Sequence, residues 1–170
     1  SAADATITAD GLASTGTVSL STNGALGDAT VVNASVLDLG TSTVGGDLVA
    51  TATTGNITDS GIVTVTGTTS LTTSQANDDI DVGTLASTGA VTLSTNGATA
   101  NATIVNASAL SFGAGSSIGG DLTATATLGN LSDAGTLTIG GNTSLTTSAA
   151  DATITADGLA STGTVSLSTN

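Results

Sequence analysis

The stretch VGGDLVATATTGNITDSG, residues 44–61, decides the fold of this chain, because it returns almost unchanged as IGGDLTATATLGNLSDAG at residues 118–135. Within each copy, apolar residues alternate with Thr and other polar residues, and the alternating segments end at Gly, Asn or Asp. Alternation with a period of two is typical of β-strands, and Gly, Asn and Asp are typical of turns. The stretch therefore predicts short strands joined by tight turns.

The chain also contains repeats on a longer scale. Residues 1–23 recur without change at residues 148–170, an offset of 147 residues. We predict a 147-residue tandem unit (1–147, with the next unit starting at 148) made of half-repeats 1–73 and 74–147. One extra residue lies between Gly113 and Ile118 in the second half-repeat, and we expect it in a loop, because an insertion inside a strand reverses the facing of its side chains. Residues 1–170 are expected to form a single continuous segment.

Tandem modules of strands predict an all-β parallel β-helix, or β-solenoid, in which each coil covers only its neighbours. The absence of Pro fits parallel ladders, which need every N–H donor. We expect about seven coils of ~20–28 residues, three in each half-repeat, with stretches 37–61, 62–89 and 90–109 as examples. A mean hydropathy of +0.39 argues against a disordered chain.

The composition excludes several functions. The net charge is −13, all of it from Asp, and the chain has no Lys, Arg, His or Cys. Without cations it cannot neutralise phosphates, so we expect no nucleic-acid partner. Ser and Thr nucleophiles have no His or Lys base, and paired carboxylates lack the residues that bind sugar, so we expect no enzyme. No run approaches a membrane span, and no cofactor is expected apart from Ca²⁺.

Comparison of the half-repeats predicts which side chains face inward. Ile7 matches Ile80, whereas Thr8, next to Ile7, matches Asp81, and a charge is tolerated only on the wet face. Val49 matches Thr123 and is therefore expected to point outward. The same comparison predicts an inward core of Ile7, Val18, Leu20, Leu48, Val63, Val65, Ile80, Val82, Val91, Leu93, Phe112, Leu122, Leu137 and Ile139.

Two groups of polar residues are candidate sites. Asp78, Asp79 and Asp81 form the densest group of carboxylates, which suits either a Ca²⁺ site or a solvated acidic face. Asn56 and Asn130 each follow Gly in a turn and are candidates for an Asn ladder along the solenoid. Both also lie in N-x-S/T sequences, which are glycosylation acceptors in secreted proteins; the others are at Asn33, Asn101, Asn106 and Asn142.

The runs TATTGNITDSGIVTVTGTTSLTT (51–73) and TATLGNLSDAGTLTIGGNTSLTT (125–147) resemble the repeats of filamentous-haemagglutinin-type adhesins. These are large bacterial surface proteins, exported by two-partner secretion or as autotransporters. The resemblance implies a right-handed parallel β-helix, an extracellular location at the bacterial cell surface, and a part in adhesion, aggregation or biofilm. The total lack of Lys and Arg departs from that family.

These observations predict a structural repeat of an extracellular bacterial fibre or adhesin stalk. Its expected partners are further repeats of the same chain, neighbouring chains in a homopolymer or lateral filament, and glycans or other cells. The alternatives are a glycan-binding module and a cation-dependent, surface-layer-like coat, and a remote one is ice binding through T-x-T pairs such as Thr51/Thr53, Thr64/Thr66 and Thr6/Thr8. The absence of Trp and Tyr disfavours a glycan-binding face.

Overall fold

The computed structural model describes residues 3–170, which form β-strands and no helix, so that none of these residues belongs to a helix able to cross a membrane. The strands are β1 (Ile7–Leu12), β2 (Ala29–Asn33), β3 (Leu37–Leu39), β4 (Ser42–Val44), β5 (Leu48–Ala52), β6 (Ile57–Asp59), β7 (Val63–Val65), β8 (Thr69–Ala76), β9 (Ile80–Ser87), β10 (Val91–Asn96), β11 (Ala102–Asn106), β12 (Leu110–Phe112), β13 (Ser116–Ile118), β14 (Leu122–Ala126), β15 (Leu131–Asp133), β16 (Leu137–Ile139), β17 (Thr143–Thr147), β18 (Ile154–Thr155), β19 (Leu159–Ser161) and β20 (Val165–Ser168).

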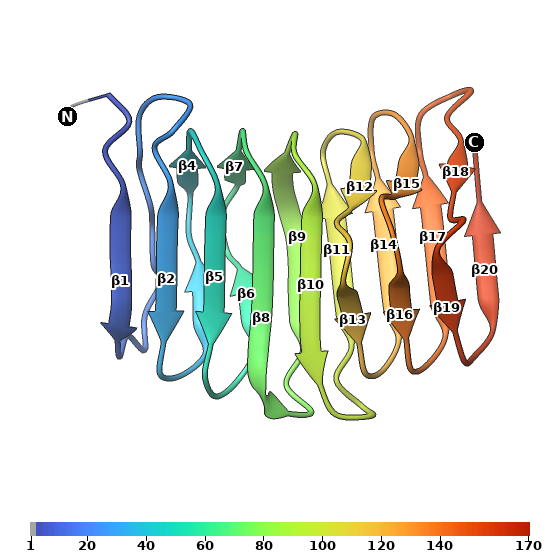
Figure 1. Cartoon of the computed structure of the whole chain (residues 1–170), viewed down its shortest axis with the longest axis horizontal. Coiled ribbons are helices and arrows are strands. Elements are labelled where there is room, and N and C mark those ends of the chain that lie inside the picture. The colour runs from blue at the N-terminus through green and yellow to red at the C-terminus, as the bar shows by residue number, and fades with distance from the viewer. Residues whose placement is uncertain (1–2) are drawn as a thin grey trace.

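The strands stack into two sheets that face each other, with the two chain ends at opposite ends of the long axis (Figure 1). Sheet A follows the order β1-β2-β5-β8-β10-β12-β15-β18, and sheet B follows β3-β6-β9-β11-β14-β17-β20. The short strands β13, β16 and β19 belong to sheet A, and β4 and β7 belong to sheet B. The strand pairs are parallel, as β5 with β8 and β14 with β17 show. The chain is therefore a β-solenoid of about eight turns, which confirms the predicted fold class.

Each coil places a long strand on one sheet and a pair of short strands on the other. In the third coil, β5 crosses sheet A, the chain turns at Gly55, and β6 and β7 cross sheet B with a bend between them. Gly55 has a φ of 80°, a backbone conformation that Gly adopts without the steric cost of a Cβ atom. The same order of long strand, turn and short pair follows from the same sequence pattern in β14, β15 and β16.

The coils are shorter than the sequence predicts. Leu48 pairs with Thr69, 21 residues further along, and Thr69 pairs with Val91, 22 residues further along. The stretches 37–61, 62–89 and 90–109 are therefore wrong as coil boundaries, since each is cut at the wrong turn. Long and short strands share one alternating pattern, and so the sequence gives little indication of where a coil closes.

Each half-repeat consequently contains three and a half coils rather than three. Leu48 in β5 lies on sheet A, and its sequence counterpart Leu122 in β14 lies on sheet B. The full 147-residue unit covers seven coils, because Ile7 and Ile154 lie in β1 and β18, the first and last strands of the eight-strand path in sheet A. Equivalent segments thus alternate between the two sheets and return to the same sheet after each full unit.

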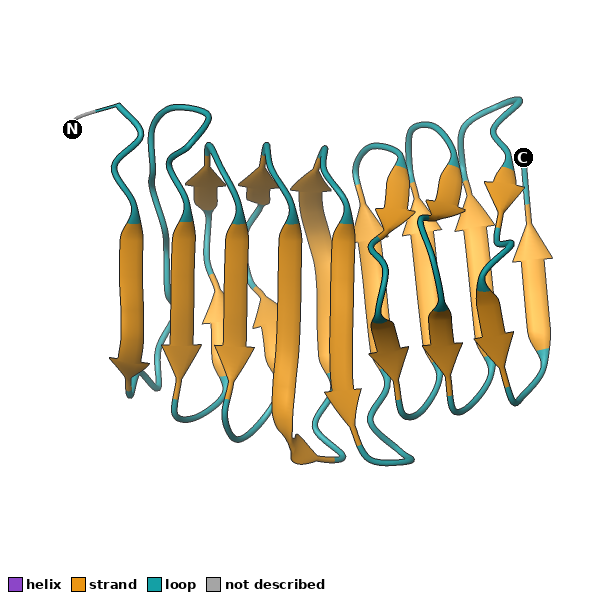
Figure 2. Cartoon of the chain, viewed as in Figure 1, coloured by secondary structure: helices purple, strands orange, loops and turns teal. Residues whose placement is uncertain are grey.

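This alternation is visible as an exchange of strand lengths along the solenoid (Figure 2). Sheet A has long strands up to β10 and short pairs after it, whereas sheet B has short pairs up to β7 and long strands after them. The exchange occurs at β9, which pairs with β6 and β7 on one side and with β11 on the other, and at β10, which pairs with β8 and with β12 and β13.

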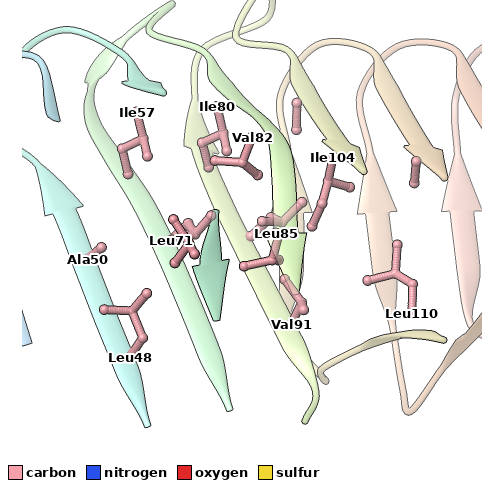
Figure 3. Packing of buried hydrophobic residues seen from close by; sticks show 14 of the residues in the cluster. Leu48, Ala50, Ile57, Leu71, Ile80, Val82, Leu85, Val91, Ile104 and Leu110 are labelled. Atoms are coloured by element: carbon pink, nitrogen blue, oxygen red, sulfur yellow. The ribbon is translucent and has the colours of Figure 1, made fainter. Parts of the chain in front are cut away.

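A continuous apolar core runs between the sheets (Figure 3). Its side chains stack in register from coil to coil, as in the column Val31, Ala50, Leu71 and Leu93. All the residues predicted to face inward are buried except Ile7 and Val18, which are partly buried and pack against the same core in the first coil. Val49 is 41% exposed, on the outer face as expected.

The extra residue of the second half-repeat lies in a loop. Residues 40–41 connect β3 to β4, whereas residues 113–115 connect the matching strands β12 and β13. Gly115, in the longer connection, has a φ of 86°. The insertion therefore leaves the facing of β13 unchanged, with Ile118 buried where Val44 is buried in the first half-repeat.

A test of the register compares two one-residue insertions. A Gly added after Thr41 copies the longer natural loop and should change the melting temperature by less than about 5 °C. A Gly added between Ser70 and Leu71 reverses the facing of one part of β8, and we expect it to lower the melting temperature by more than about 10 °C or to prevent folding. Circular dichroism on heating measures both, and equal melting temperatures would contradict the register.

Candidate functional site

The most regular polar feature is a column of Asn and Asp side chains at one corner of the solenoid, which we call the sheet B column. Each member immediately precedes a strand of sheet B, and its Oδ1 accepts a hydrogen bond from the backbone N–H of the equivalent residue in the next coil. The N···O distances lie between 2.6 and 3.0 Å. The members are Asn56, Asp79, Asn101, Asp121 and Asn142, and the last donor is Thr164.

A second, interrupted column precedes the strands of sheet A. Asp28 accepts from the N–H of Asp47, and Asp47 accepts from the N–H of Thr68, where the side-chain column stops. It resumes at Asn130, whose Oδ1 accepts from the N–H of Thr153 at 3.0 Å. Both columns replace water on strand-initiating N–H groups with a side-chain acceptor and so tie successive coils together.

Asn56 and Asn130, the ladder candidates, therefore lie in columns of this kind, but not in the same one. Asn56 belongs to the sheet B column and Asn130 to the sheet A column, because three and a half coils separate them. Their partners are backbone N–H groups rather than other side-chain amides. The amide-on-amide stacking that the sequence suggested is thus replaced by mixed columns in which Asp and Asn are equivalent as acceptors.

The three carboxylates proposed for Ca²⁺ point to different places. Asp78 accepts the N–H of Gly55 from the preceding coil at 2.5 Å, and Asp79 accepts the N–H of Asn101 from the following coil at 2.7 Å. Asp81 is exposed on the outer face of β9. Across residues 3–170, no three acidic or other metal-binding side chains are grouped in a way that could hold an ion.

The sequence analysis missed the importance of Asn106 and its counterpart Asn33, both fully buried. The Oδ1 of Asn106 accepts the N–H of Ser87 at 2.9 Å, and its Nδ2 donates to the carbonyls of Ser87 and Ala109 at 2.9 and 2.7 Å. Asn33 makes the same contacts to Ser14 and Val36. A signal was present, since both occupy an inward position of an alternating strand, where an apolar residue is expected.

Burial also divides the N-x-S/T sequences. The Nδ2 groups of Asn33 and Asn106 are enclosed and already donate hydrogen bonds, so the folded chain cannot present them to a glycosyltransferase. Asn101, Asn130 and Asn142 are exposed, and Asn56 is partly exposed. Any glycosylation of the folded protein is therefore confined to the two columns.

The glycines of the conserved-looking GG pairs are required by the closeness of the coils. A Cβ atom on Gly119 would overlap the carbonyl oxygen of Gly97, and one on Gly140 would overlap that of Gly119. The turns of successive coils therefore touch through their backbones, and only Gly leaves enough room.

The T-x-T pairs do not form a single array. Thr51 faces outward on β5 of sheet A, Thr64 faces outward on β7 of sheet B, and Thr6 lies before β1. Outward Thr residues do stack in register within a sheet, as Thr51 and Thr72 do. The hydroxyl surface is thus divided between both faces of the solenoid.

The fold and the columns together define a parallel β-solenoid built from tandem repeats. A sequence profile of a family described as repeats of unknown function (DUF5649) matches residues 26–82 and 99–168, and the chain belongs to this family. The two matched segments start 73 residues apart, which is the half-repeat. Neither a curated protein nor a solved structure matches the chain.

Two Asn→Asp substitutions separate the two roles of Asn. Asn106→Asp removes the donors to two buried carbonyls and buries a charge, so we expect a loss of at least about 3 kcal/mol in the free energy of unfolding. Asn101→Asp keeps the acceptor and stays exposed, and should cost less than about 1 kcal/mol. Denaturant titration followed by circular dichroism measures both, and a loss at Asn101→Asp as large as at Asn106→Asp would refute the assignment.

Proposed function

We propose that this chain is a structural repeat segment of an extracellular bacterial fibre or adhesin stalk. The observation that carries the proposal is the match between the repeat and the coil: one 147-residue unit fills seven whole coils. Each further unit therefore continues the same solenoid in phase, with the same residues on the same face. A protein that must span a distance gains length in this way without any new contact.

The stiffness of such a rod follows from its bonding. Backbone ladders connect each coil to the next on both sheets, the two columns add side-chain bonds at the corners, and the core is filled by aliphatic side chains. Each coil covers its neighbours over their full area, so bending requires many contacts to open at once.

The surface chemistry fits an exposed, water-filled setting. Thirteen Asp residues, with no Lys, Arg or His to pair with them, give the chain its net charge of −13. A charge of this size favours solubility. The absence of Lys and Arg also removes every site for trypsin-like proteases.

The concave surface offers little for binding a small polar ligand. A shallow groove of about 270 Å³ lies beside β9 and is lined by Ile62, Gly83, Thr84, Leu85, Ala86, Val105, Ala107 and Thr127. None of these residues is charged or aromatic, and Ser and Thr hydroxyls elsewhere have no basic partner in this sequence. A mechanical role therefore agrees better with this surface than an enzymatic or glycan-binding role.

The resemblance to filamentous-haemagglutinin-type repeats supports the same proposal, because those repeats form the long stalks of surface adhesins. The parallel solenoid is the fold that this resemblance implies, and the half-repeats carry the quoted motifs at equivalent places in the coil. Adhesion itself is then expected of other parts of the assembly, with these repeats holding them away from the cell.

Labelling of intact cells tests the location. Antibodies raised against the 170-residue segment and detected by immunogold electron microscopy should decorate the surface of unbroken producing cells, along fibres. Labelling that appears only after the cells are broken would contradict an extracellular role.

The length of tandem arrays tests the mechanical part of the proposal. Seven coils at about 4.8 Å each should add about 34 Å for every 147-residue unit. Small-angle X-ray scattering of arrays with one, two and three units should show a maximum dimension that rises by this amount per unit at constant cross-section. A cross-section that grows with the number of units would mean that the units fold back on one another.

A further inference from the structure

The eight longest outer-face strands outside the junction carry no carboxylate. In sheet A these are β2, β5, β8 and β10, and in sheet B they are their counterparts β11, β14, β17 and β20. We call the outer surfaces of these two sets the neutral faces. Their outward residues are Thr30, Val32, Val49, Thr51, Ser70, Thr72, Thr92 and Ser94 on sheet A, and Thr103, Val105, Thr123, Thr125, Ser144, Thr146, Ser166 and Ser168 on sheet B.

The carboxylates of the strands lie elsewhere. Asp38, Asp59 and Asp133 are in the short strands β3, β6 and β15, and Asp10 and Asp81 are in β1 and β9, where the strand lengths exchange. The remaining Asp residues of the described chain lie in turns. Each half-repeat therefore has a neutral side and an acidic side, and the neutral side is sheet A in the first half and sheet B in the second (Figure 2).

The neutral faces are also less polar than the surface around them. Val49, 41% exposed, lies near the middle of the sheet A face between Thr30 and Ser70. The apolar groove beside β9 borders the sheet B face at Val105, and Ile62 at its rim is 59% exposed. Flat strands that present Thr methyl groups and Val side chains can be covered by another surface without desolvating a charge.

Charge then restricts where two copies of this chain can touch. With no Lys, Arg or His, no copy can offer a cation to the carboxylates of another, so acidic surfaces repel wherever they approach. Contact through the neutral faces avoids both this repulsion and the cost of burying an unpaired carboxylate.

We propose that the two neutral faces are the surfaces through which a second copy of this chain docks side by side. The inference goes beyond the proposed function, for which a single rod suffices. Because the faces lie on opposite sides of the solenoid, each copy can contact two neighbours, and the assembly grows laterally rather than closing as a dimer.

One contact of this kind is small. Four strands about 4.8 Å apart and about five residues long present roughly 300 Å² of flat surface, well below the roughly 800 Å² per partner of a stable interface. Repetition supplies the strength, because the faces recur with every unit and two aligned rods form several contacts at once. Association should therefore be weak for the 170-residue chain and much tighter for longer arrays.

Sedimentation velocity of the 170-residue chain and of a two-unit array tests the proposal. Both should associate, the array at least tenfold more tightly. Raising the salt from about 0.01 to 0.15 M should strengthen association, because the screening length falls from about 30 to about 8 Å and carboxylate repulsion weakens. EDTA should have no effect, which separates this contact from a coat held together by divalent cations.

Substitutions of equal charge locate the contact. Val49→Asp with Thr51→Asp blocks the sheet A face, and Thr123→Asp with Thr125→Asp blocks the sheet B face. Each pair should weaken association at least tenfold and limit it to dimers, and all four together should give monomers. The control, Thr43→Asp with Thr64→Asp, adds the same charge on the short strands of sheet B and should leave association within about twofold.

The outcomes are distinct. Parent arrays that stay monomeric up to about 1 mM, or a control that acts as strongly as the face variants, would overturn the proposal. Circular dichroism spectra and melting temperatures should match among the variants, since all the substituted residues point outward. Surface labelling of cells together with monomeric arrays would leave the stalk function standing and remove only the lateral contact.

Discussion

The stacking of each coil on the one before it, about 21 residues earlier, is the constraint on which the rest of the structure depends. Parallel backbone ladders fix the spacing, so that every side chain lies against its counterpart in the neighbouring coil. Inward positions must then be aliphatic or satisfy their own hydrogen bonds, as Asn106 does. Turn positions must be Gly where backbones touch, and corner positions favour Asn or Asp, whose oxygens accept the next coil's N–H.

The same constraint links the repeat to the surface. A half-repeat of three and a half coils turns each segment to the opposite sheet, and the full unit restores it. The acidic and neutral sides therefore alternate along the rod, and the sequence period becomes a pattern of charge on its two faces. A chain with cations could pair its carboxylates and conceal this pattern, but here the charge distribution is set by Asp alone.

Much of the fold could be predicted from the sequence because facing in a strand depends on a local alternation. Comparison of Thr8 with Asp81 and of Val49 with Thr123 was enough to orient strands in both half-repeats. The length of a coil could not be predicted, because it depends on which turn brings a strand beside its predecessor. The columns were found only in part: Asn56 was identified, but Asp79, Asp121 and Asn101 in the same column were not, because only the correct coil length aligns them.

The distance between Val49 and Thr123 tests the account most directly, because the chain has no Cys and both positions can be spin-labelled after substitution by Cys. Three and a half coils place them on opposite faces, with backbones roughly 20 Å apart and labels directed away from each other, so electron paramagnetic resonance should give a separation clearly above 20 Å. Labels at Val49 and Ser70, neighbours on sheet A, should show strong dipolar broadening. A separation of roughly 14 Å between Val49 and Thr123 would place them on one face, three coils apart, and contradict the account.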